Sequence, residues 1–98
     1  MHEEIMNLIE YSKGGILSKE IIKNDKLNVT LMCMAAGTDL SEHTSTRQGT
    51  VYIVEGKGIF SLKGEDIVMA PGVLIYMEAD SVHSLKAQDD TSFILTLA

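Results

Sequence analysis

Residues 50–62, TVYIVEGKGIFSL, hold the pattern that decides the fold. Two short runs rich in β-branched and aromatic residues, Thr50 to Val54 and Gly58 to Leu62, lie on either side of Gly56-Lys57-Gly58. Such residues favour strands, and closely spaced glycines favour a turn. The stretch therefore predicts two consecutive strands joined as a β-hairpin. It does not predict a nucleotide loop, because the long glycine spacing and the following helix that phosphate binding needs are missing.

Similar short runs continue on both sides of this stretch. Apolar and polar residues alternate in segments 27–33 and 93–97, which is the period of a strand with one buried face. Further β-rich runs lie at residues 16–23, 67–70, 73–77 and 82–86, and turn residues separate them. No segment has a sustained helical period. Short strands with a turn about every 8–12 residues are typical of a sandwich or barrel, so we predict an all-β fold.

Length and composition predict one domain over residues 1–98. Hydrophobic residues make up 45% of the chain and charged residues 22%, as in ordinary globular domains. No low-complexity linker or change of composition divides the sequence. A barrel of this size has a small core and leaves strand edges that need a cover. We therefore expect a homodimer, with the segments before Gly37 at its interface.

Charge and hydropathy argue against two classes of partner. The net charge is −6, the sign of nucleic-acid phosphates, and the eight Lys and Arg residues do not cluster, so no nucleic-acid binding is expected. The longest apolar stretch, Ile67 to Met77, is interrupted by Pro71-Gly72 and is too short to cross a bilayer, so no membrane binding is expected. The N-terminus lacks the charge and apolar run of a signal peptide, which predicts a cytoplasmic protein.

Cys33 is the only cysteine, which excludes an internal disulfide and suits a reducing compartment. It continues the alternating apolar face of Leu27, Val29 and Leu31. That position predicts a buried, inert thiol that faces the core.

Two of the three histidines are candidates for chemistry. His2 lies at a terminus that is expected to fray. His43 precedes the strand predicted at residues 50–54, and His83 lies at the start of the run at residues 82–86. A pair of histidines commonly serves only to hydrogen-bond to backbone or side-chain partners, so position in the fold decides between that role and a functional one.

The spacing around His43 resembles the first motif of the cupin family. That motif has a glycine, five residues, His-x-His, a glutamate and a closing glycine. Gly37, His43 and Gly56 stand at the corresponding positions. The second histidine and the metal-binding glutamate of the motif are replaced by Ser45 and Gly49.

The segment from Gly72 to His83 resembles the second cupin motif at both of its ends, although Glu78 and Asp80 replace its proline and second glycine. The resemblance implies a double-stranded β-helix, or jelly-roll barrel, in which both histidines point into one pocket. Residues 1–36 would then form the N-terminal strands, and residues 37–97 would carry the two motifs.

The resemblance also defines candidate ligands for a metal. His43 and His83 match ligand positions, but two residues of the usual set of four are absent, and catalytic metal sites commonly use at least three protein ligands. We therefore predict no cofactor beyond a weakly bound divalent metal such as Zn, Ni, Fe or Mn.

Other polar residues are candidates for the same pocket. We place Gln48, Arg47 and Tyr76 beside the two histidines as ligand-binding residues, with Arg47 as a possible partner for a carboxylate. Gln48, Tyr76, Glu42 and Cys33 are the residues that would complete a metal site. Strand parity argues against Gln48 as a ligand, because Gly49, Val51 and Ile53 share one face of the strand and Gln48 lies on the other.

These residues leave three functions open. The first is a small cupin barrel of unassigned specific function that binds a small polar or anionic molecule at His43 and His83. The alternative is a metal-dependent cupin enzyme of the isomerase, cyclase or dioxygenase type that uses the two histidines plus waters. A third is a dimerising partner domain with a vestigial pocket. The residues leave open whether the protein is an enzyme and which ligand it binds.

Overall fold

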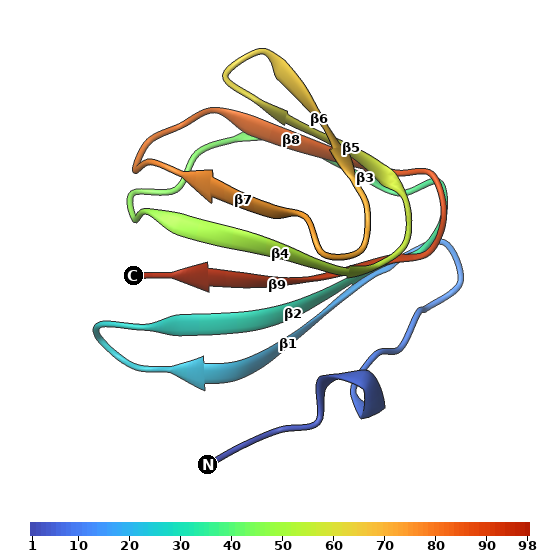
Figure 1. Cartoon of the computed structure of the whole chain (residues 1–98), viewed down its shortest axis with the longest axis horizontal. Coiled ribbons are helices and arrows are strands. Elements are labelled where there is room, and N and C mark those ends of the chain that lie inside the picture. Colours follow the sequence, from blue (N-terminus) through green and yellow to red (C-terminus); the bar gives the residue numbers. More distant parts are fainter.

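The protein consists of two antiparallel β-sheets that face each other, in a computed structural model that describes all 98 residues (Figure 1). A short 3-10 turn, η1 (Ile5–Asn7), precedes the first strand. The strands are β1 (Ile16–Lys23), β2 (Asn28–Met34), β3 (Asp39–His43), β4 (Gly49–Glu55), β5 (Gly58–Leu62), β6 (Glu65–Met69), β7 (Leu74–Met77), β8 (His83–Ala87) and β9 (Thr91–Leu97). The structure has no helix long and apolar enough to cross a membrane.

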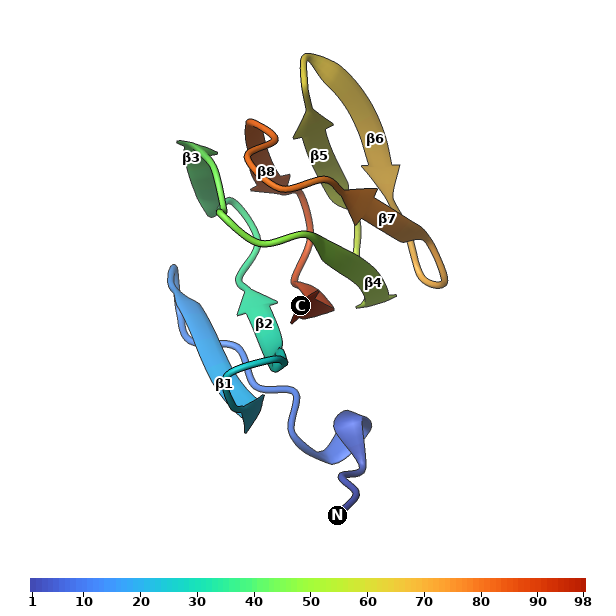
Figure 2. The same cartoon turned by 90° about the vertical axis from the view of Figure 1, so that its left-hand side faces the viewer.

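The two sheets form the jelly-roll barrel that the sequence predicts. The larger sheet has the strand order β1-β2-β9-β4-β7, and the smaller has the order β3-β8-β5-β6. Figure 2 shows the smaller sheet opposite the larger one, with the N-terminal segment outside the larger sheet. The core between the sheets contains a cluster of ten buried residues: Met34, Val51, Ile53, Phe60, Met69, Ile75, Met77, Leu85, Ala87 and Phe93.

The prediction of a hairpin between residues 50–54 and 58–62 is wrong. β4 pairs with β7 and β9, whereas β5 pairs with β6 and β8, so the Gly56-Lys57-Gly58 segment crosses from one sheet to the other. The crossing is held by the buried Thr91, whose hydroxyl donates to the Lys57 carbonyl (3.1 Å) and accepts from the Lys57 amide (3.1 Å). Turn residues indicate where a strand ends, but they do not indicate which strand it pairs with.

Consecutive strands do pair at two other predicted turns. β1 and β2 are joined around Asn24, and β5 and β6 are joined by Lys63 and Gly64. Lys63 has a φ of 51° and Gly64 has a φ of 82°. Positive φ at both central residues is typical of the two-residue turn whose twist matches that of the flanking strands.

The two faces of β2 are both apolar, and the prediction of which one faces the barrel interior is wrong. Met34 belongs to the core cluster, and Met32 lines the cavity between the sheets. Leu31 and Cys33 alternate with these residues and therefore lie on the outer face, although both are fully buried. Cys33 is buried, as predicted, but it lies outside the barrel.

The N-terminal segment covers this outer face. The Tyr11 hydroxyl donates to Glu55 Oε1 (2.8 Å), and the Lys19 ammonium donates to the Leu8 carbonyl (2.8 Å) and to Glu10 Oε1 (2.9 Å). Burial raises the pKa of Tyr11 far above its usual value. The part of this segment from Leu8 to Tyr11 is therefore attached to the larger sheet by side-chain hydrogen bonds.

Candidate functional site

The structure places His43 and His83 next to each other on neighbouring strands. They are register partners in the antiparallel pair of β3 and β8. Their ring centroids are 4.1 Å apart, with the ring planes at 63°. His83 is buried, whereas His43 is exposed, so the pair extends from the barrel interior to its surface.

An irregularity in β3 directs His43 toward this pair. The register of β3 against β8 shifts between Leu40 and His43. In a regular strand, residues three apart point to opposite faces, yet Leu40 and His43 both line the same cavity. A β-bulge is a common means of re-aiming a side chain near a functional site. The sequence prediction did not include this strand.

Each imidazole is oriented by a backbone carbonyl two residues earlier in the chain. His43 Nδ1 lies 2.7 Å from the Ser41 carbonyl oxygen, and His83 Nδ1 lies 2.9 Å from the Ser81 carbonyl oxygen. A carbonyl only accepts hydrogen bonds, so Nδ1 carries the proton in both rings. In the neutral rings, both Nε2 atoms are therefore unprotonated acceptors.

Burial shifts the proton equilibrium of the inner ring. Desolvation is the main cause that lowers the pKa of His83 below its ordinary value of 6.5, and the adjacent His43 lowers it further. The hydrogen bond to the Ser81 carbonyl acts in the opposite direction. Burial therefore favours the neutral form of the His83 ring.

The cavity below the two rings has a volume of about 110 Å³ and is largely apolar. Phe60 stacks parallel to His83, with ring centroids 5.8 Å apart and planes within 3°. The lining residues other than the two histidines are all hydrophobic: Met32, Leu40, Val51, Phe60, Met77, Leu85, Phe93 and Leu95.

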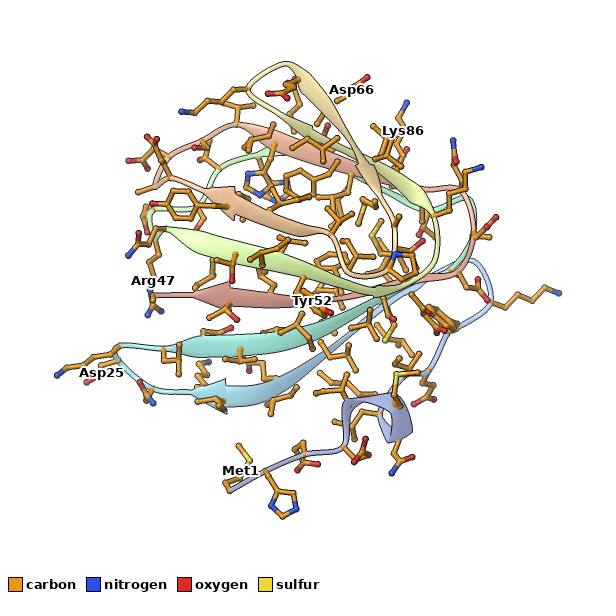
Figure 3. All side chains as sticks on the ribbon, viewed as in Figure 1. Met1, Asp25, Arg47, Tyr52, Asp66 and Lys86 are labelled. Carbon is orange, nitrogen blue, oxygen red and sulfur yellow. The ribbon has the colours of Figure 1, made fainter.

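Three residues expected beside the histidines lie elsewhere. Tyr76 alternates with Met77, which lines the cavity, so its side chain points out of the barrel and is 55% exposed. Its hydroxyl donates to Gln48 Oε1 (2.9 Å), and both residues line a separate surface hollow. Arg47 lies beside the C-terminal end of β9 (Figure 3) and does not line the cavity. The predicted pocket is corrected accordingly, because strand parity and the loop before β4 direct these groups outward.

Glu42 and Cys33 do not complete a metal site either. Glu42 is exposed and does not line the cavity, and Cys33 is on the outer face of the larger sheet. No three His, Cys, Asp or Glu side chains come together anywhere in the chain. The donors at the site are thus two imidazoles, which does not fit a metal centre with three or four protein ligands.

Packing also occupies the position of the missing carboxylate. A Cβ atom at Gly49 would lie 2.7 Å from Leu97 Cδ2 and 2.9 Å from the Thr96 carbonyl oxygen. Its neighbour Met77 already lines the cavity. A larger side chain at residue 49 would have to displace Leu97, so the departure from the family motif is built into the packing of β4 and β9.

The serines near the site do not form a nucleophilic pair with the imidazoles. No serine hydroxyl hydrogen-bonds to either ring, and the Ser81 hydroxyl is buried without a partner in the protein. The Ser45 hydroxyl accepts from the Arg47 amide (3.2 Å). The arrangement lacks the hydroxyl–imidazole contact that activates a serine nucleophile.

Sequence reasoning missed the apolar floor of the cavity, above all Phe60. The available signal was strand parity: Leu62 is the register partner of His83, and Phe60 lies two residues further along the same strand. That signal depends on knowing that β5 and β8 are neighbours, which the sequence pattern does not show.

Comparisons with known proteins agree with this geometry. A family model described as Cupin domain matches residues 30–98. A conserved protein of unknown function from Streptococcus pyogenes superposes with a TM-score of 0.90 at 20% identity, covering 100% of this chain and 86% of the other. An RmlC-like cupin from Shewanella frigidimarina gives 0.82 at 20% identity, covering 91% and 80%.

A third structural match is KdgF from Halomonas sp., with a TM-score of 0.79 at 21% identity, covering 90% of this chain and 82% of the other. A search among curated proteins finds no sequence match. Identities of this size establish the fold and do not assign a reaction. Since the family model spans most of the sequence, and the two-sheet barrel is the fold of the matching structures, the chain belongs to the cupin family.

Proposed function

We propose that this cupin is a small-molecule-binding protein whose ligand occupies the cavity between the sheets and contacts His43 and His83. One observation carries the proposal: two imidazoles from different strands, 4.1 Å apart, lie over an otherwise apolar cavity. Ligand sites in proteins are commonly apolar pockets with a few convergent polar groups.

The size of the cavity limits the ligand. Its volume of about 110 Å³ is smaller than the roughly 150 Å³ of an engineered apolar cavity that binds benzene. Because His43 is exposed, the site has an open side where a substituent can extend into solvent. The part of the ligand inside the cavity is therefore no larger than about one six-membered ring.

Phenol is a suitable probe because it has this size and one polar group. Long-range ¹H–¹⁵N spectra of the imidazoles resolve the protein's three histidines, and His2 serves as an internal control because it is exposed at the N-terminus. The expected result is that the His43 and His83 signals shift with phenol and saturate, while His2 does not change. If neither ring responds at millimolar phenol, the proposal is wrong.

A weakly held divalent metal, Zn, Ni, Fe or Mn, is the second candidate for the site. It is favoured by one specific observation, the two unprotonated Nε2 atoms, since neutral imidazole nitrogens are good ligands for such metals. Elemental analysis of untagged protein, followed by calorimetric titration with Zn and Ni, tests it. His43→Ala and His83→Ala should each abolish binding. Stoichiometric metal that survives dialysis would mean that further ligands exist.

We also propose that the protein is a cytoplasmic homodimer, and we place its interface on β4 and β7 instead of on the segments before Gly37 that the sequence suggested. The large exposed apolar side chains include Tyr52, Leu74 and Tyr76, which lie on β4 and β7. Tyr52 and Leu74 are register partners, so their side chains share a face. Exposed apolar patches of this kind are typical of protein interfaces.

A further inference from the structure

The hydrogen-bonding groups of the cavity differ from those expected for a site that binds anions. Apart from His43 and His83, every lining residue is hydrophobic and offers neither an N–H nor an O–H group from its side chain. Strand amides next to the cavity are largely used in the sheet ladders. The two imidazoles therefore determine which polar groups a ligand can pair with.

Both imidazoles line this space, and a neutral imidazole has one acceptor nitrogen. Each Nδ1–H is already used by a backbone carbonyl, that of Ser41 for His43 and that of Ser81 for His83. Neutral rings in this tautomer have only the Nε2 lone pair left. The side chains that line the cavity thus supply two hydrogen-bond acceptors and no free donor.

An anion finds no compensating charge there. Arg47 does not line the cavity, and Lys86 is on the outer face of the smaller sheet with Ser61 and Asp66 (Figure 3). An oxygen that can only accept would be buried without a partner, and that costs more than leaving it in water. A carboxylate or phosphate that enters the apolar part of the cavity would also lose its hydration without gaining an ion pair.

From these contacts we infer that the cavity selects small uncharged molecules that carry a hydrogen-bond donor, an O–H or N–H group, and discriminates against anions. The inference rests on the proposed function, since it assigns a ligand class to the same site. The ring centroids are 4.1 Å apart and both rings line the cavity, so one small ligand can contact both imidazoles.

A series of four probes with the same ring tests the inference by varying only the substituent. Aniline carries two donor hydrogens, phenol carries one, toluene carries none, and benzoate is an anion. Dissociation constants come from the imidazole signals at about pH 8, where imidazoles are neutral. A net hydrogen bond corresponds to roughly a two- to tenfold change in affinity. We expect aniline and phenol each to bind roughly two- to tenfold more tightly than toluene. Benzoate should bind more weakly than phenol.

Variants show whether the imidazoles cause this selectivity. The quantity compared is the ratio of phenol to toluene affinity, which a general loss of packing leaves unchanged. His43→Ala should lower that ratio toward one, whereas the matched control His2→Ala should leave it as it is.

Each alternative outcome has a separate meaning. If toluene and phenol bind equally to the wild-type protein, or if benzoate binds most tightly, the ligand class is wrong while the cavity remains a binding site. If no probe shifts the signals of either ring, the proposed function fails and the inference fails with it.

Discussion

Replacing Gly56 with alanine should destabilise the barrel more than an ordinary glycine substitution. Gly56 has a φ of +109°, a conformation that L-residues rarely adopt, and an added Cβ would lie 2.5 Å from the Asp90 carbonyl oxygen and from Thr91 Cα. The backbone strain costs about 1–3 kcal/mol. The overlap adds roughly 1–3 kcal/mol, because the neighbours are backbone atoms that cannot rotate away. The two costs together should lower the free energy of unfolding by about 4 kcal/mol.

Gly64→Ala is the matched control for this substitution. Gly64 also has a positive φ, +82°, but an added Cβ there meets nothing within 4 Å. Its cost is therefore only the backbone term, about 1–2 kcal/mol. The difference between the stability losses of the two variants gives the cost of the overlap between residue 56 and the start of β9.

Thermal unfolding followed by far-UV circular dichroism measures both variants, since the chain has no tryptophan for fluorescence. For a domain of this size, 1 kcal/mol corresponds to a shift in Tm of about 4–8 °C, so Gly56→Ala should lower Tm by roughly 15–30 °C. Equal losses of stability in Gly56→Ala and Gly64→Ala would refute the reasoning, because they would mean that β9 does not constrain the crossing.

Three further results are expected. Burial lowers the pKa of His83 below 6.5, so as the pH falls the imidazole is protonated in the unfolded protein before it is protonated in the folded protein. The free energy of unfolding should therefore fall as pH drops below 6.5 and level off below the folded-state pKa. His83→Gln should flatten that dependence in urea titrations. The Cys33 thiol should react slowly with a thiol reagent under native conditions, because it is buried. Tyr11→Phe removes the hydrogen bond to Glu55 and should accelerate the labelling of Cys33. Rapid labelling of the wild-type protein would contradict the burial of Cys33. Light scattering at high micromolar concentration should give twice the mass of the chain, and a monomer would rule out the dimer.

Local patterns predicted most of the strands because their signals are carried by adjacent residues. β1 and β5 begin and end where the β-rich runs do, at Ile16–Lys23 and Gly58–Leu62. β3 was not predicted, because its bulge and its mostly exposed side chains remove the alternation that identifies a strand. The pairing of strands was harder to predict than their existence, as the crossing at Gly56 illustrates.

The face that a strand buries is predictable only when its two faces differ. In β2, Leu31 and Cys33 are as apolar as Met32 and Met34, so the sequence pattern does not distinguish a face against the N-terminal segment from a face against the barrel core. The exposure of Tyr76, by contrast, follows from the parity of β7 once Met77 is known to point inward.

The departure from the family motif replaces two metal-coordinating residues by Ser45 and Gly49, and it also changes the packing around the site. With glycine at residue 49, Leu97 packs where a carboxylate side chain would enter, and the neighbouring Met77 contributes to the cavity wall. The site therefore combines two imidazoles with an apolar floor. Gly49→Glu alone would not restore a metal centre, because Leu97 and the Thr96 carbonyl leave no room for the added side chain. The packing around Gly49 thus leaves this position without a metal-binding carboxylate.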